Sequence, residues 1–219
     1  MRVYYFTGAQ YALSNIALRR VKISRFRDLN DPFELMAVNL GDKRHREAFS
    51  ATKQDIDKDK GLICFSRSWK NPLLWGHYAE KHTGIALGFD IPDHQLTEVL
   101  YEPRLLDISL DPKTKRPRAE LIDKLIRTKF HDWKYEDEWR LFIELEHDTV
   151  EAGLYFHPFS KEFALREVIL GPRCELPMKG VRNMVKVFRP DVQIVKSSIA
   201  FTRFEVLESK AATRADAKP

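Results

Sequence analysis

Residues 61–91 constrain this chain most, because they predict a strand, a helix and a second strand in close succession. The first strand is the apolar run at 62–65. Asn71 followed by Pro72 is a typical helix start, with an N-cap residue before a proline at the first helical position. Gly84 is placed to end that helix, and 85–89 is again apolar enough for a buried strand. The expected apolar face of the helix consists of Leu74, Trp75, Tyr78, Ala79 and His82.

The remaining hydrophobic patterns predict an α+β fold with a mixed, mostly antiparallel sheet and a few flanking helices. We expect one domain over residues 1–208 and a disordered tail over 209–219, which is small and charged. The expected strands lie at 3–6, 21–23, 139–146, 154–156, 168–170, 192–195 and 199–206. The expected helices lie at 9–18, 121–130 and 181–188.

The formal net charge of +5 permits an anionic partner such as a nucleotide or nucleic acid. The chain has two cysteines, Cys64 and Cys174, which is too few for a disulfide framework. We expect Cys64 to be buried in its strand and Cys174 to be more exposed in a loop. No apolar run approaches the ~18 residues of a membrane span, and the first residues do not resemble a signal peptide. A cytoplasmic location without membrane contact is therefore expected.

The segment WKYEDEWR, from Trp133 to Arg140, concentrates charges among aromatic rings. We expect a strand starting at Tyr135. Its two-residue period places Glu136, Glu138 and Arg140 on one face. Two carboxylates roughly 7 Å apart beside an arginine can orient a polar substrate, so Glu138 and Glu136 are candidate catalytic residues and Arg140 a candidate substrate-binding residue. The alternative is a solvated strand face with cross-strand ion pairs.

Two histidines belong to the predicted central helix, five residues apart. That spacing does not place both on one helix face, so they are not expected to bind one zinc ion, and no metal site is predicted. His77 is a candidate catalytic residue and His82 a candidate substrate-binding residue. For each, the alternative is a hydrogen-bonded structural histidine.

Asn30, Asp31 and Glu34 belong to a turn that also contains Pro32 and Phe33. Asn and Asp before a proline often only set the turn, with their side-chain oxygens accepting from backbone amides. Glu34 has no such structural role to play. We take all three as candidate substrate-binding residues, and we expect the turn to be packed down and shaped.

Ser66 and Tyr78 complete the candidate substrate-binding set. Ser66 follows the first central strand, and Tyr78 lies on the central helix. A serine in that position is often only a turn cap. No G-x-S-x-G elbow surrounds it, so nucleophilic hydrolysis is not supported.

These motifs, in this order, resemble the bacterial domain-of-unknown-function family 2971. The resemblance spans about residues 3–206 and implies no established activity. It rests on Asn30-Asp31-Pro32-Phe33-Glu34, Cys64-Phe65-Ser66, Trp75-x-His77-Tyr78-Ala79-x-x-His82-x-Gly84, Trp133-x-Tyr135-Glu136-x-Glu138-Trp139-Arg140 and Glu167-Val168-Ile169-Leu170-Gly171.

The layout is also similar to the ADP-ribosyltransferase fold, in an opening strand, a short helix and a strand ending in Ser66-x-Ser68. That resemblance implies NAD as co-substrate, with Glu138 or Glu167 as the late catalytic glutamate. It further implies that Tyr78 or Trp75 stacks on the nicotinamide. The chain departs from the pattern at Tyr5, where His or Arg is expected. The alternative function is a non-catalytic module that binds nucleic acid or protein through a basic surface.

Overall fold

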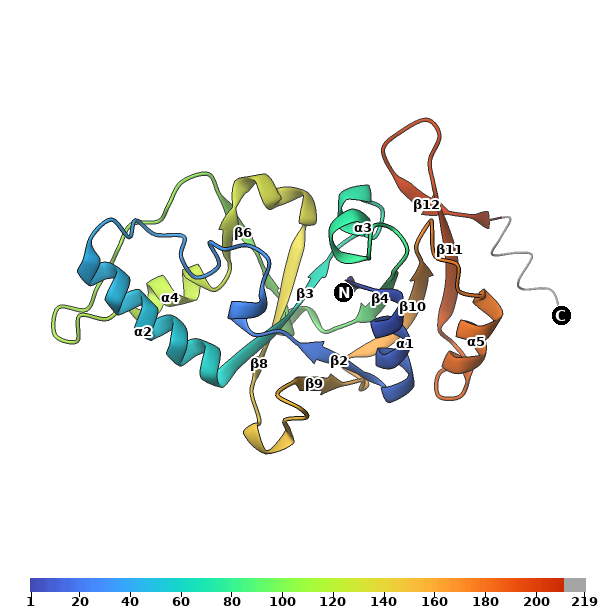
Figure 1. The fold of residues 1–219 in the computed structure, drawn as a ribbon, viewed down its shortest axis with the longest axis horizontal. Coiled ribbons are helices and arrows are strands. Elements are labelled where there is room, and N and C mark those ends of the chain that lie inside the picture. Colours follow the sequence, from blue (N-terminus) through green and yellow to red (C-terminus); the bar gives the residue numbers. More distant parts are fainter. Residues whose placement is uncertain (211–219) are drawn as a thin grey trace.

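The fold is organised around an eight-stranded sheet with the strand order β12-β11-β10-β4-β1-β3-β8-β5 (Figure 1). The computed structural model describes residues 1–210. The strands of this sheet are β1 (Arg2–Thr7), β3 (Lys60–Ser66), β4 (Ile85–Asp90), β5 (Thr97–Glu98), β8 (Glu138–Glu144), β10 (Ala164–Leu170), β11 (Gln193–Ile199) and β12 (Val206–Glu208). β10 and β11 pair in parallel and the other neighbours are antiparallel, which confirms the predicted mixed, mostly antiparallel α+β fold.

Two further pairs of strands and several helices flank this sheet. The small pairs are β2 (Arg20–Ile23) with β9 (Tyr155–Pro158), and β6 (Leu100–Glu102) with β7 (Thr128–Phe130). The α-helices are α1 (Ala9–Leu18), α2 (Lys43–Asp59), α3 (Pro72–Tyr78), α4 (Ala119–Leu125) and α5 (Met178–Lys186). The 3-10 helices are η1 (Phe26–Asp28), η2 (Asp93–Gln95), η3 (His131–Glu136) and η4 (His147–Thr149). Figure 1 shows α1 and α5 beside one end of the sheet and α2 and α4 beside the other. None of the helices within residues 1–210 is long and apolar enough to cross a membrane.

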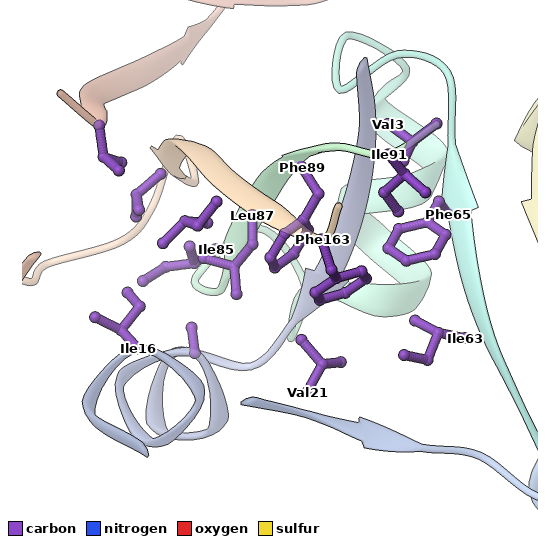
Figure 2. Close-up of a cluster of buried hydrophobic side chains, with 14 of the residues drawn as sticks. Val3, Ile16, Val21, Ile63, Phe65, Ile85, Leu87, Phe89, Ile91 and Phe163 are labelled. Atoms are coloured by element: carbon purple, nitrogen blue, oxygen red, sulfur yellow. The ribbon is translucent and has the colours of Figure 1, made fainter. Parts of the chain in front are cut away.

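The main hydrophobic core lies on the sheet face that α1 and α5 cover. Figure 2 shows part of it, including Ile16, Leu87 and Phe163. Successive residues of a strand point to opposite faces, so Ile85, Leu87 and Phe89 of β4 enter this core together. Ile16 of α1 packs there as well. The intervening residue Ala86 belongs to a different cluster, on the opposite face.

That opposite face carries two separate hydrophobic clusters. One forms around Trp75 and Ala79 of the α3 region, against Ala86 and Ile169. The other forms around Leu62 of β3 together with residues of η1, α2 and α4. Because the two clusters do not merge, a space is left between them on this face, and the site described below occupies it.

The central strand–helix–strand unit forms as predicted, up to the end of its helix. Asn71 caps α3 by accepting a hydrogen bond from the Leu73 amide at 3.0 Å. The helix then ends at Tyr78, because Glu80, Lys81 and His82 all have positive φ values (46°, 52° and 77°). His82 therefore lies in a tight turn, so the prediction that it belongs to the apolar helix face is wrong.

Three other sequence predictions need correction. Phe130 is not helical, because α4 ends at Leu125 and residues 128–130 form β7. The expected strand over 199–206 is a hairpin instead, in which the Ala200 amide donates to the Glu205 carbonyl at 2.9 Å. Cys174 is buried, with 6% of its surface exposed, whereas Cys64 is only partly buried. Of the predicted disordered tail, residues 211–219 lie outside the described part of the chain.

We predict that Trp75→Ala lowers the free energy of unfolding by about 3–5 kcal/mol, as large aromatic truncations in cores do. The side chain is fully buried, its ring packs edge-to-face on Phe6, and its Nε1 donates to the Trp69 carbonyl at 2.6 Å. Urea unfolding measures the change. The control is Phe201→Ala, whose ring is 97% exposed and whose loss should change stability by less than about 0.5 kcal/mol. Equal effects of the two variants would contradict the assigned packing.

Candidate functional site

A cavity of about 280 Å³ lies between the two clusters on this sheet face. Aromatic and apolar side chains form most of its wall, and a group of charged side chains closes one side. The wall comes from Tyr4, Tyr5 and Phe6 of β1, Cys64, Phe65 and Ser66 of β3, and Leu74 and Tyr78 of α3. The remaining lining residues are Ser24, Asp28, Leu29, Asn30, Glu34, Lys129, Glu136 and Glu138.

The cavity forms where the pairing of β1 with β3 stops. The two strands share one registered pair, Tyr4 with Ser66, whereas β1 and β4 share six. Beyond that pair, β1 continues to pair with β4 and β3 continues to pair with β8, so β1 and β3 diverge from each other. The opening between them explains why residues of both strands line the same cavity.

Arg140 is the centre of the charged group and is fully buried. Its Nη2 and Nη1 donate to the two carboxylate oxygens of Glu34 at 2.6 and 3.0 Å. Its Nε donates to Glu138 Oε1 at 2.8 Å, and its Nη1 also donates to the Ile126 carbonyl at 2.7 Å. This planar, bidentate geometry is the one for which arginine is suited, and it ties the 30–34 turn to β8.

Lys129 bridges the two carboxylates that sequence analysis singled out. Its Nζ donates to Glu136 Oε2 at 2.5 Å and to Glu138 Oε2 at 3.1 Å. It also lies 4.8 Å from the centroid of the Trp133 ring, a cation–π contact. No motif marks Lys129 in the sequence, and the hydrophobic pattern around it predicts a helix over 121–130, so its role could not be anticipated.

Tyr78 connects this buried group to the surface. Its hydroxyl donates a short hydrogen bond to Glu136 Oε1 and accepts one from Asn30 Nδ2 at 2.7 Å. A continuous series of hydrogen bonds therefore runs from the exposed Asn30 through Tyr78, Glu136 and Lys129 to Glu138.

The pKa values of the two neighbouring carboxyl groups move in opposite directions. Burial alone would raise the pKa of Glu138, but Arg140 and Lys129 together lower it to about 2. Burial raises the pKa of Glu136 above its ordinary value, since Lys129 offsets only part of the effect and Glu138 adds to it. Burial likewise raises the pKa of Glu34. Glu138 is thus held ionised, while Glu136 is the group suited to take up a proton.

Seven of the sequence-derived candidates meet at this cavity or in its ion network: Asn30, Glu34, Ser66, Tyr78, Glu136, Glu138 and Arg140. The expected reason for the meeting of Glu136 with Glu138 is wrong, however. Glu136 ends η3, and β8 begins only at Glu138 after Asp137 with φ 45°. A turn, and not a shared strand face, brings the two carboxylates to Lys129.

Three candidates lie elsewhere. His77 is exposed, and its ring lies 6.2 Å from the centroids of Trp133 and Tyr135, outside the cavity. His82 lies near Arg173 and does not line the cavity, and burial lowers the pKa of the His82 side chain. Asp31 is buried and accepts a hydrogen bond from the Phe33 amide at 2.9 Å. This is the turn-setting role that was the structural alternative for Asp31.

Of the two competing late glutamates, only Glu138 lines the cavity. Glu167 of β10 accepts a hydrogen bond from the Tyr4 hydroxyl at 2.9 Å and pairs with Arg2 at 2.8 Å. Ser66 Oγ donates to the Ser68 carbonyl and accepts from the Ser68 amide, so Ser66 both caps a turn and lines the cavity. Among residues 1–210, no group of three or more His, Cys, Asp or Glu side chains is arranged to hold a metal ion.

No protein-family model matches the chain, and no curated protein or solved structure matches it either. The resemblances to family 2971 and to the ADP-ribosyltransferase fold therefore stay predictions from sequence motifs.

We predict that Lys129→Met lowers the free energy of unfolding at pH 7 by about 3–5 kcal/mol, because it leaves two buried carboxylates without their shared cation. The matched control is Lys124→Met. Lys124 is half exposed and makes one 3.6 Å pair with Glu102, so its loss should cost less than about 1 kcal/mol.

The penalty should depend on pH in a defined direction. The pKa of Glu138 is about 2 in the folded protein, below its ordinary 4.5, so its ion pairs contribute stability above pH 4.5 and lose it as pH falls toward 2. The difference between wild type and Lys129→Met is therefore largest near neutral pH and shrinks below pH 4.5. Urea unfolding at several pH values measures it, and a constant difference would contradict the assigned ion pairs.

Proposed function

We propose that this protein is an ADP-ribosyltransferase-like enzyme that uses NAD and breaks the bond between nicotinamide and ribose in the cavity. One observation carries the proposal. Glu136 and Glu138 line one cavity and share the Lys129 ammonium, and their pKa values are displaced in opposite directions. Adjacent carboxyl groups with separated pKa values are the arrangement that glycosidic-bond chemistry uses.

Glu138 suits the stabilisation of positive charge. When the C1′–N bond breaks, its electron pair leaves with the nicotinamide nitrogen, and positive charge develops on C1′ and the ribose ring oxygen. A carboxylate that stays ionised and is held by Arg140 and Lys129 can stabilise that charge without reorienting. Both cations hold Glu138 in place, so its orientation is preset.

Glu136 suits the proton transfer that completes the reaction. A water or an acceptor hydroxyl forms the new C1′–O bond, and its proton passes to the Glu136 carboxylate. The raised pKa of Glu136 favours this uptake, and the Tyr78 hydroxyl orients the carboxylate through Oε1. Tyr78 is in this scheme a positioning residue.

The walls of the cavity suit a planar ring that is cationic in NAD, because aromatic faces attract cations. Tyr78, Tyr4 and Phe6 line it, so an aromatic surface is available to the nicotinamide. Trp75 of α3 is the other stacking residue that the resemblance implied. Its side chain is fully buried in a hydrophobic cluster, so it is not available for this role.

We predict that the purified protein releases nicotinamide from NAD and that Glu138→Gln slows the release by about 100-fold or more, because the stabilising charge is lost. Chromatographic quantification of nicotinamide measures the rate. Glu138→Gln also deprives two buried cations of a partner, so the assay is run below the melting temperature of the variant. The matched control is Glu144→Gln on the same strand, whose side chain is 76% exposed and which should keep the wild-type rate.

Tyr78→Phe separates a catalytic arrangement from a purely structural one. The Tyr78 hydrogen bond lowers the pKa of Glu136, so its removal raises that pKa. Activity that requires ionised Glu136 is gained as pH rises through its pKa, and the variant should therefore show its acid limb at higher pH than wild type. A pH–rate profile measures this. Absence of NAD turnover in the wild-type protein would overturn the proposal, and salt-sensitive nucleic-acid binding without turnover would favour the binding-module alternative.

A further inference from the structure

A second cavity, of about 350 Å³, borders the charged side of the first cavity, and Lys129 lines both. Its lining includes Phe33, Phe130, Leu105 and Arg104. Both phenylalanine side chains line the cavity and are also exposed, Phe33 by 57% and Phe130 by 47%. Within residues 1–210 neither ring packs against another aromatic ring.

The two cavities share a wall made by two short segments. In the turn, Glu34 binds Arg140 inside the ion network while its neighbour Phe33 lines the second cavity. In β7, Lys129 reaches the carboxylates of the first cavity, and the adjacent Phe130 lines the second. Each segment therefore contributes to both cavities: Glu34 and Lys129 line the first, and Phe33, Lys129 and Phe130 line the second.

Phe33 is held at the surface by a shaped turn. The buried Asp31 accepts from the Phe33 amide at 2.9 Å, and the Phe33 carbonyl accepts from the Met36 amide at 2.7 Å. Leu35 adopts φ 60°, a left-handed conformation that is uncommon for residues other than glycine. The turn thus fixes the Phe33 ring in the lining of the cavity, where a bound ligand can cover it.

Arg104 supplies a charge at the same place. It is exposed, and within the described residues it makes no ion pair, in contrast to Lys124, which pairs with Glu102. The cavity is also lined by Glu102, whose charge is paired with Lys124. Exposed aromatic rings beside an unpaired guanidinium, on a chain of net charge +5, are features with which proteins bind single-stranded nucleic acid. Bases stack on the rings, and the cation contacts a phosphate.

We propose that the second cavity anchors a nucleobase of a single-stranded nucleic acid, with Phe33 and Phe130 as stacking surfaces and Arg104 at the neighbouring phosphate. The proposal concerns binding alone and does not depend on the NAD chemistry of the first cavity.

Fluorescence anisotropy with short fluorescein-labelled single-stranded DNA and RNA, in the absence of NAD, tests the proposal. Phe33→Ala and Phe130→Ala should each weaken binding about 5- to 100-fold, the range for loss of one stacked base. Phe33→Tyr, which keeps the ring, should retain the wild-type affinity. Arg104→Gln should weaken binding and reduce the salt dependence by about one phosphate contact.

The matched controls are Phe201→Ala and Arg203→Gln in the β11–β12 hairpin, where Phe201 is 97% exposed; both should leave the affinity unchanged. Urea unfolding checks that every variant is folded. Absence of binding, equal loss in the hairpin controls, or equal affinity for a duplex would overturn the proposal. Equal affinity for a mononucleotide would also overturn the proposal, since the cavity would then be a small-molecule site. Pull-down of a protein that depends on Phe33, without oligonucleotide binding, would assign the cavity to a protein partner instead.

Discussion

The fully buried guanidinium of Arg140 is the constraint on which the site depends. An unpaired charge in a protein interior is very costly, so the fold must supply carboxylates around it. Glu34 and Glu138 do so, one from a turn and one from a strand, and the Ile126 carbonyl satisfies a further donor. The 30–34 turn is therefore bound to β8 even though the two are more than 100 positions apart in the chain.

The same requirement places acidic groups against an opening in the sheet. Once β1 leaves β3 after a single registered pair, the carboxylates of Glu136 and Glu138 border a cavity with mostly apolar walls. The network sets three carboxylates, Glu34, Glu136 and Glu138, against two cations, Lys129 and Arg140. The negative charge of Glu138 therefore adds to burial in raising the pKa of Glu136. Stability and reactivity thus draw on one network, so substitutions in it affect both.

Local signals predicted the framework well. Asn71 before Pro72 identified the start of α3, and the alternation around β8 correctly placed Glu138 and Arg140 on one face. Errors arose where the chain changes direction against the periodic pattern. His82 fits a helical face in the sequence, but three positive φ values end the helix before it, and Phe130 continues an apolar pattern in a segment that turns into β7.

The α+β class, the central strand–helix–strand unit and most of the residues that meet at the cavity follow from local sequence patterns, because they depend on periodicity, capping and unusual local composition. How those residues meet depends on long-range contacts of the folded chain. Lys129 carries no local signal, and its importance comes from a parallel pairing of β6 with β7 that brings its ammonium to two carboxylates. Long-range strand pairing and charge neutralisation in a dry interior are properties of the assembled fold, so no local pattern encodes them.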